Sequence, residues 1–152
     1  MYIMDYLRKF ENKRIKLFVD MDGVIAHYDF GKPFGYMDKR PLTTSIEKLK
    51  EISNYDNIEM YILSVSKTDL GLEEKNIWLD KDAPFFKKEN RVILSKETYP
   101  NVSTMELKSN YLKEINRDNS IIILIDDDPR ILKEVNKNNE DIYLLKDSAL
   151  ID

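Results

Sequence analysis

The sequence predicts an α/β fold, a three-layer sandwich whose middle layer is a mainly parallel, five-stranded, Rossmann-like sheet. Short apolar runs alternate with amphipathic stretches along the 152 residues, which is typical of βαβ units joined by right-handed crossovers. Two of these runs, residues 15–19 and 121–125, end abruptly on aspartates. Because open α/β sheets bind ligands just outside the carboxyl ends of their strands, these aspartates are expected to mark the functional edge of the sheet.

The expected strands are short runs of β-branched, aliphatic and aromatic residues, bounded by charged or turn-forming residues. Five stretches of the chain meet this description: 15–19, 58–63, 91–94, 121–125 and 142–145. The second of them is expected to end on Ser64. Since helical stretches separate successive strands, the sheet is expected to be mainly parallel.

The expected helices place apolar residues three and four positions apart, so that one face packs on the core. Five segments have this spacing: 2–12, from about 44 onward, 70–81, 105–116 and 129–136. Thr44 or Ser45 is expected to cap the second of these helices. In the third, Leu72, Ile77 and Trp78 are expected to face the core.

Residues 24–42 form a loop-like stretch after the first strand, punctuated by glycine and proline. We interpret it as a small cap-like insert in a chain that otherwise forms a single domain over residues 1–152. The insert contains four aromatic residues: Tyr28, Phe30, Phe34 and Tyr36. These rings either stack on a nucleotide base or form the small core that allows the insert to fold.

Composition narrows the class of protein. Hydrophobic residues make up 42% and charged residues 34% of the chain, as in ordinary globular domains. The net charge of −4 argues against a nucleic-acid partner. The absence of cysteine excludes disulfides and thiolate metal sites, and the single histidine, His27, excludes multi-histidine zinc sites. Without a transmembrane-length apolar stretch or a secretion signal at residues 1–14, we expect a soluble cytoplasmic protein with no membrane partner.

The acidic residues after the two strands predict a cation site. Asp20 and Asp22 lie two residues apart and are followed by Gly23, which lets the chain turn away. Carboxylates held together repel one another unless a cation or a shared proton relieves them. A hard cation such as Mg²⁺ suits such oxygen ligands. The run 126–128 follows the other strand, and its last member is expected to cap the helix that begins at Pro129.

The motifs, taken in order, resemble those of the haloacid dehalogenase (HAD) superfamily. They are Asp20-Met-Asp22-Gly-Val, a strand ending on Ser64, Lys108, and Asp126-Asp127. The spelling of these motifs, with the segment 74–81, resembles the 5′(3′)-deoxyribonucleotidase-like group. The insert is shorter than the helical cap of those relatives, which implies a more open site.

The resemblance implies roles for individual residues. Asp20 would attack phosphorus and become an aspartyl-phosphate, and Asp22 would act as general acid and then general base. Lys108 would pair with the nucleophile and with the phosphate. Ser64 and Val65 would bind substrate beside Lys108, with the Ser64 hydroxyl bonding phosphoryl oxygens.

The resemblance also implies Mg²⁺ as the cofactor. The ion would be held by the carboxylate of Asp20, the backbone carbonyl of Asp22, and Asp126 or Asp127. For these groups to meet, the first and fourth strands must be neighbours, and right-handed crossovers then predict the spatial order 5-4-1-2-3.

The expected function is therefore Mg²⁺-dependent hydrolysis of a small phosphomonoester, specifically that of a 5′(3′)-deoxyribonucleotidase-like nucleotidase. The alternatives are a phosphatase for nucleic-acid ends or another small phosphomonoester, and a catalytically inactive phosphate-binding relative. A response-regulator receiver is excluded because its acid pair comes at the first strand and its lone phosphorylated aspartate later.

Overall fold

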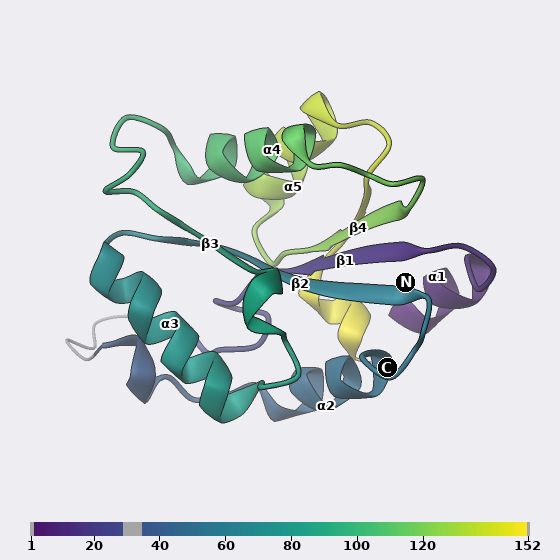
Figure 1. The fold of residues 1–152 in the computed structure, drawn as a ribbon, viewed down its shortest axis with the longest axis horizontal. Helices are drawn as coiled ribbons and strands as arrows, with labels where there is room; N and C mark the ends of the chain where they lie inside the picture. The colour runs from purple at the N-terminus through teal and green to yellow at the C-terminus, as the bar shows by residue number, and fades with distance from the viewer. Residues whose placement is uncertain (1, 29–34, 152) are drawn as a thin grey trace.

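The computed structural model describes residues 2–28 and 35–151. One five-stranded parallel sheet, in the order β3-β2-β1-β4-β5, forms the centre of the molecule (Figure 1). This is the predicted strand order. The strands are β1 (Ile15–Val19), β2 (Ile58–Ser66), β3 (Arg91–Ser95), β4 (Ile121–Ile125) and β5 (Tyr143–Leu145).

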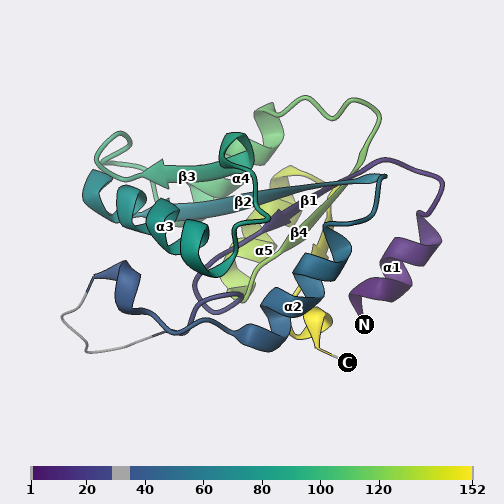
Figure 2. The same cartoon turned by 60° about the horizontal axis from the view of Figure 1, so that its bottom comes forward.

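Helices cover both faces of the sheet and complete the predicted three layers. They are α1 (Ile3–Lys9), α2 (Thr43–Ile52), α3 (Asp69–Asp82), α4 (Thr104–Glu114) and α5 (Pro129–Asn138). Helices α4 and α5 lie together on one face, while α2 and α3 lie on the other (Figures 1 and 2). Short 3-10 turns also occur at Tyr36–Asp38, Lys88–Asn90 and Asp147–Leu150.

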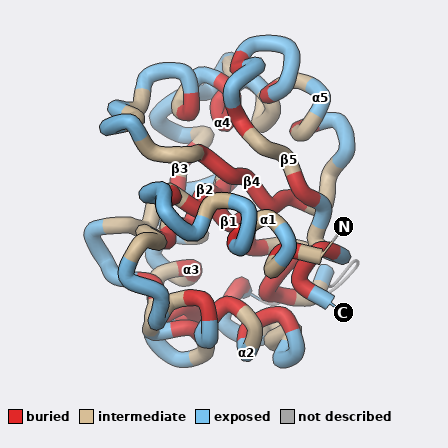
Figure 3. The backbone as a smooth tube through the Cα atoms, turned by 90° about the vertical axis from the view of Figure 1, so that its right-hand side faces the viewer, coloured by how far each residue is buried: buried red, intermediate tan, exposed pale blue. Residues whose placement is uncertain are grey.

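The core is divided by the sheet into two apolar layers. β1 contributes to both of them, because alternate side chains of a strand point to opposite faces: Leu17 and Val19 pack on one side and Phe18 on the other. The buried backbone runs through the strands, and exposed residues gather on the outer turns of the helices (Figure 3). Among the described residues, no helix combines the length and apolar character needed to cross a bilayer.

Two details of the helices differ from expectation. Helix α2 begins at Thr43 after Leu42, so neither Thr44 nor Ser45 is its cap. The start is set instead by tertiary hydrogen bonding, because the Leu42 amide donates to the carbonyl oxygen of Ile25 at 2.8 Å. In α3, Ile77 is 54% exposed, so it faces solvent rather than the core.

The register of the sheet brings the two acidic segments to the same level. Val19 pairs with Ile125 of β4 on one side and with Ile62 of β2 on the other. Asp20 therefore leaves the sheet beside Asp126, and its amide donates to the Ile125 carbonyl at 3.0 Å. The predicted edge of the sheet thus holds the aspartates of both motifs.

The described part of the insert packs against α3. The Tyr36 ring meets the Trp78 ring edge-on at 6.0 Å between centroids, and the Trp78 indole N–H donates to the Lys39 carbonyl at 2.9 Å. Tyr36 is buried in the core, which agrees with the expectation that aromatic residues of the insert form its small core. Phe30 and Phe34 lie outside the described residues.

Candidate active site

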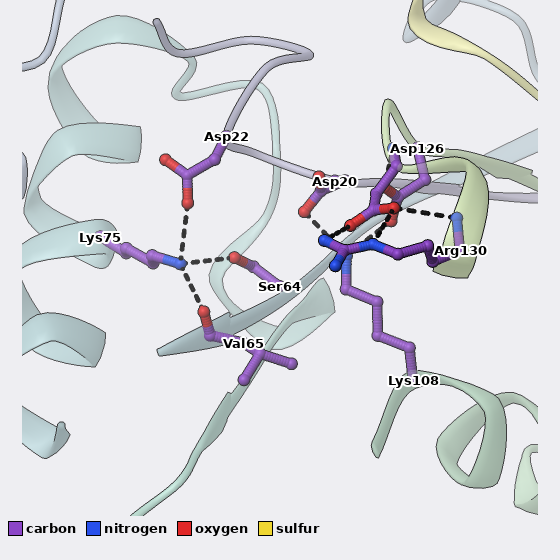
Figure 4. Close-up of polar contacts among 9 residues, drawn as sticks. Asp20, Asp22, Ser64, Val65, Lys75, Lys108, Asp126 and Arg130 are labelled. Atoms are coloured by element: carbon purple, nitrogen blue, oxygen red, sulfur yellow. Dashed lines mark hydrogen bonds and ion pairs between the residues drawn. The ribbon is translucent and has the colours of Figure 1, made fainter. Parts of the chain in front are cut away.

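Lys108 joins the two acidic motifs at the edge of the sheet. Its ammonium donates to Asp20 Oδ1 at 2.8 Å and to Asp126 Oδ2 at 2.7 Å. Lys108 rises from α4 toward both carboxylates (Figure 4). All three residues are buried, and a buried ion group is stable only when its charges are paired and hydrogen-bonded.

The electrostatics of this group depend on burial and on the neighbouring charges. Burial raises the pKa of Asp20 to about 7, because the attraction of Lys108 only partly offsets the cost of desolvating the carboxylate. Burial would lower the pKa of Lys108, but the charges of Asp20 and Asp126 raise it above its ordinary value. The lysine therefore stays charged, while Asp20 gains further stabilisation from any additional cation.

Asp127 supplies a third carboxylate to the group. One oxygen from each of Asp20, Asp126 and Asp127 lies within 4.8 Å of the others. Burial, followed by the charge of Asp126, raises the pKa of Asp127 to about 6. Within the part of the chain that the structure describes, its buried Oδ1 atom has no hydrogen-bond partner.

The backbone at Gly23 leaves room for Asp127. Gly23 has a φ of +81°, a conformation that residues with a side chain rarely adopt. A Cβ atom at this position would collide with the Asp127 carboxylate and with the ring of Tyr28. Glycine is therefore needed both for the turn after β1 and for the close approach of the two motifs.

Asp22 lies apart from the three clustered carboxylates and is paired with two lysines. Its Oδ1 accepts from the Lys39 ammonium at 2.6 Å, and its Oδ2 lies 3.5 Å from the Lys75 ammonium. Burial opposes ionisation of Asp22, but the attraction of Lys75 and the hydrogen bond from Lys39 outweigh it and lower the pKa of the carboxyl. The side chain is therefore ionised at neutral pH in the resting structure.

Lys75 also contacts the end of β2. Its ammonium donates to Ser64 Oγ at 2.7 Å and to the Val65 carbonyl at 2.8 Å (Figure 4). Ser66, the last residue of β2, instead donates to the carbonyl of Thr68 at 2.8 Å and so belongs to the turn before α3. Of the two serines, Ser64 is the one that lies beside the acidic residues.

A cavity of about 320 Å³ opens over these residues. Six of the residues predicted from sequence line it: Asp20, Asp22, Ser64, Val65, Lys108 and Asp127. The remaining lining residues come from the insert, the first turns of α4 and α5, and the α5 cap: Tyr28, Thr104, Met105, Asp128, Arg130 and Ile131. Asp126 lies behind this wall, fully buried and bonded to Lys108. The structure thus brings the whole predicted set together around one cavity.

The cluster of Asp20, Asp126 and Asp127 fits a hard divalent cation. Carboxylate oxygens are the ligands that Mg²⁺ prefers. None of the described residues donates to the buried Oδ1 of Asp127, and a bound cation would satisfy this acceptor. Over the described ranges 2–28 and 35–151, Lys108 pairs with Asp20 and Asp126 of this cluster, and the third carboxylate leaves negative charge that a cation would neutralise.

Asp128 and His27 lie outside the cluster of Asp20, Asp126 and Asp127. Asp128 caps α5, as predicted, by accepting from the Arg130 amide at 2.9 Å. His27 lines a different cavity, beside Gly23 and the start of α2. His27 is therefore not one of the residues that line the cavity over Asp20.

Sequence reasoning missed Lys39 and Lys75. A signal for Lys75 was present, because it lies three and four residues before Trp78 and Leu79, which are both buried. A lysine on the buried stripe of a helix needs an anionic partner. Lys39 carries no such signal, since it lies in an irregular segment whose path depends on tertiary packing.

The fold is shared with solved structures. No family model matches the chain, and no curated protein sequence is significantly similar to it. A chain in the structure of the Pnkp1/Rnl/Hen1 complex has a TM-score of 0.68 and 15% identity, and the match covers 88% of this chain and 46% of that one. A chain in the structure of the Pnkp1/Rnl/Hen1 RNA repair complex has a TM-score of 0.66 and 15% identity, and the match covers 89% of this chain and 43% of that one.

A Class C acid phosphatase from Bacillus anthracis, solved with tungstate bound, has the same fold. Its TM-score is 0.61 at 15% identity, with 97% of this chain and 72% of that chain covered. This protein spans less than half the length of the two chains from the repair complexes. The sheet order and these likenesses define a protein with the HAD-like α/β fold that the motifs of the sequence predict.

Proposed function

We propose that this protein is a Mg²⁺-dependent phosphomonoester hydrolase that works through an aspartyl-phosphate. One observation carries the proposal: Lys108 joins Asp20 to Asp126 at the base of a cavity, beside the unpartnered oxygen of Asp127. This arrangement supplies a nucleophile, a fixed positive charge and a cation site within one pocket. A catalytically inactive phosphate-binding relative is the weaker proposal, because every position that the chemistry needs is filled.

The proposed reaction has two steps. An Asp20 carboxylate oxygen attacks phosphorus while the bond to the leaving oxygen breaks, and Asp22 takes the proton of the phosphate monoanion and passes it to that leaving oxygen. Water then attacks phosphorus of the aspartyl-phosphate, Asp22 takes a proton from the water, and the bond to Asp20 breaks. Lys108 and the Ser64 hydroxyl stabilise the charge on the phosphoryl oxygens.

The cofactor proposal follows from the same cluster. Asp20, Asp126, Asp127 and the backbone carbonyl of Asp22 would hold Mg²⁺. When bound, the ion neutralises the charge that would otherwise repel a phosphate dianion from this acidic site. Lys108 holds Asp20 and Asp126 together through its two hydrogen bonds.

A nucleoside monophosphate is the proposed substrate class, with deoxyribonucleotides hydrolysed at least as well as ribonucleotides. Tyr28 supports this choice, because it lines the cavity and is 47% exposed, so its ring is accessible to a base. Stacking on an aromatic ring is worth roughly 1–3 kcal/mol per base. Tyr28→Ala should therefore reduce kcat/KM for dTMP about tenfold while sparing p-nitrophenyl phosphate; equal effects on both would contradict nucleotide selection.

Terminal phosphates of nucleic acids are the second candidate substrate. The likeness to a chain of an RNA repair complex favours this class, and Arg130 supplies an exposed positive charge at the cavity. A preference for a phosphorylated oligonucleotide over the matching mononucleotide, weakened by salt, would favour it. The net charge of −4 counts against it.

The deciding experiment is a screen of phosphomonoesters with the purified protein, in Mg²⁺ and in EDTA. The proposal expects hydrolysis in Mg²⁺ and its loss in EDTA, with Asp20→Asn inactive on the same substrates. Phosphate binding without hydrolysis of any substrate would instead support the non-enzymatic relative.

A further inference from the structure

We propose that Lys39 and Lys75 are positioning residues for Asp22, an inference that rests on the proposed phosphatase activity. Together we name them the Asp22 clamp. The two ammonium groups approach different oxygens of one carboxylate: Lys39 lies 2.6 Å from Oδ1 and Lys75 lies 3.5 Å from Oδ2. A carboxylate held at both oxygens cannot rotate about its terminal bond without losing one of these partners.

The clamp is itself held in place by aromatic packing. The ring of Tyr36 lies under both cations, with its centroid 4.6 Å from the Lys39 ammonium and 5.1 Å from that of Lys75. Such contacts stabilise cations over aromatic faces. Trp78 packs edge-on against Tyr36 and donates to the Lys39 carbonyl at 2.9 Å. Residues 36–39 of the insert and α3 therefore form one unit that presents two cations to Asp22.

Lys75 connects this unit to the phosphate-facing end of β2. It is only 4% exposed, and its ammonium also donates to Ser64 Oγ and to the Val65 carbonyl. A lysine ammonium has three donor hydrogens, so these two hydrogen bonds leave one donor directed to neither Ser64 nor Val65, and Asp22 Oδ2 lies 3.5 Å from the same ammonium. Lys75 thereby links Asp22 to Ser64, and both residues line the cavity.

The clamp leaves Asp22 able to transfer a proton. Each carboxylate oxygen has two acceptor positions; the hydrogen bond from Lys39 uses one position on Oδ1, and Lys75 approaches Oδ2 as an ion pair. The remaining position on an oxygen can carry the proton that goes to the leaving oxygen as its bond to phosphorus breaks. Because misplacing a reacting group by about 1 Å can cost about 10²-fold in rate, holding this carboxylate is expected to matter for the chemical step.

The test compares two aryl esters of the same shape, phenyl phosphate and p-nitrophenyl phosphate. Phenoxide is the more basic leaving group and needs the proton, whereas p-nitrophenoxide leaves readily without it. Lys39→Met should lower kcat/KM for phenyl phosphate about tenfold or more, and for p-nitrophenyl phosphate by less than about threefold. Lys39→Arg, which keeps a charged donor, should restore most of the loss, and Arg40→Met is the matched control.

A double-mutant cycle separates positioning from substrate binding. With Asp22→Asn already present, Lys39→Met should cause less than about a twofold further loss on phenyl phosphate. Lys75→Met should show the same leaving-group dependence, and circular dichroism checks that it folds. Lys39→Met tests the proposal even if Lys75→Met does not fold, because Lys39 is partly exposed.

The outcomes distinguish the two proposals. Equal losses on both esters, or a full effect of Lys39→Met in the Asp22→Asn background, overturn the clamp while leaving the phosphatase activity intact. A rise in KM alone assigns the lysines to substrate binding and also overturns it. If the wild-type protein hydrolyses neither ester nor any other phosphomonoester, the proposed function itself fails, and the clamp fails with it.

Discussion

The Lys108 ammonium donates to the carboxylate of Asp20 at 2.8 Å, although the two residues are 88 positions apart in the chain. Helix α4 supplies the lysine, and the turn after β1 supplies the aspartate. The contact is buried, so it depends on the accurate docking of α4 on the sheet. The predictions below test this group of residues and what surrounds it.

Replacement of Lys108 by methionine should destabilise the protein, because it leaves Asp20 and Asp126 buried without their shared cation. Removing one partner of a buried ion pair typically costs about 3–5 kcal/mol. Urea unfolding in EDTA measures the loss, and Mg²⁺ should restore part of it. Lys113→Met, an exposed lysine on the same helix, is the control and should change stability by less than about 0.5 kcal/mol.

Asp20→Asn should abolish turnover while leaving the fold intact, because a carboxamide cannot form the aspartyl-phosphate. The loss of kcat should be at least about 10³-fold, the scale seen when an enzyme loses its nucleophile. Steady-state kinetics and mass spectrometry of protein quenched during turnover check this. Activity well above trace, or a phosphorylated residue other than Asp20, would remove Asp20 from the nucleophilic role.

Asp22→Asn should reduce turnover by about 10²–10⁴-fold through loss of proton transfer, with little change in Mg²⁺ affinity. The reason is that the Asp22 side chain faces Lys39 and Lys75 rather than the three clustered carboxylates. Calorimetric Mg²⁺ titration, together with kcat at saturating metal, separates the two effects. Normal turnover with weakened Mg²⁺ binding would contradict the assignment.

Mg²⁺ should stabilise the protein more at pH 8 than at pH 5.5. The folded, metal-free pKa values of Asp20 and Asp127 are raised to about 7 and about 6, above the ordinary value near 4 of the unfolded chain. The folded state thus binds the protons of these two carboxyls more tightly than the unfolded chain does. Their protonation contributes stability that is fully present below the unfolded pKa and is lost as the pH rises through about 6 and about 7. Mg²⁺ competes with those protons.

The measurement for this pH dependence is the shift in Tm on adding Mg²⁺, taken at several pH values between 5.5 and 8. The shift should grow as the pH rises. In Asp127→Asn the growth should be smaller, because one of the two competing sites is removed. A Tm shift independent of pH would argue against these carboxylates as the metal ligands.

Gly23→Ala should destabilise the protein and weaken Mg²⁺ binding together. The left-handed conformation costs an alanine about 1–2 kcal/mol, and its Cβ would also press on the Asp127 carboxylate. Denaturant unfolding and Mg²⁺ titration measure the two effects. Gly71→Ala offers a comparison: its Cβ would meet the Ser66 hydroxyl rather than the acidic group, so Mg²⁺ binding should be retained.

Much of the fold follows from local patterns in the sequence. Strands such as Ile121–Ile125 are continuous apolar runs, and their ends are marked by charged residues. Such runs are typical of strands buried on both faces of a parallel sheet. The acidic residues at their ends predicted that β1 and β4 are neighbours, and this gave the strand order and the meeting of Asp20 with Asp126. The length of β2, which continues to Ser66, and the start of α2 at Thr43 depend on neighbouring segments.

The sequence by itself determined which residues gather at the cavity. They are Asp20, Asp22, Ser64, Lys108 and the 126–127 pair, which follow strands or lie on a helix at expected positions.

Only the tertiary structure decided what surrounds Asp22. Lys39 and Lys75 come from an irregular insert and from a helix with polar residues on several sides, so no local period marks them as neighbours. They meet because Tyr36 and Trp78 pack the insert on α3. Long-range packing of this kind depends on the shape and burial of distant side chains, which a short sequence pattern does not encode.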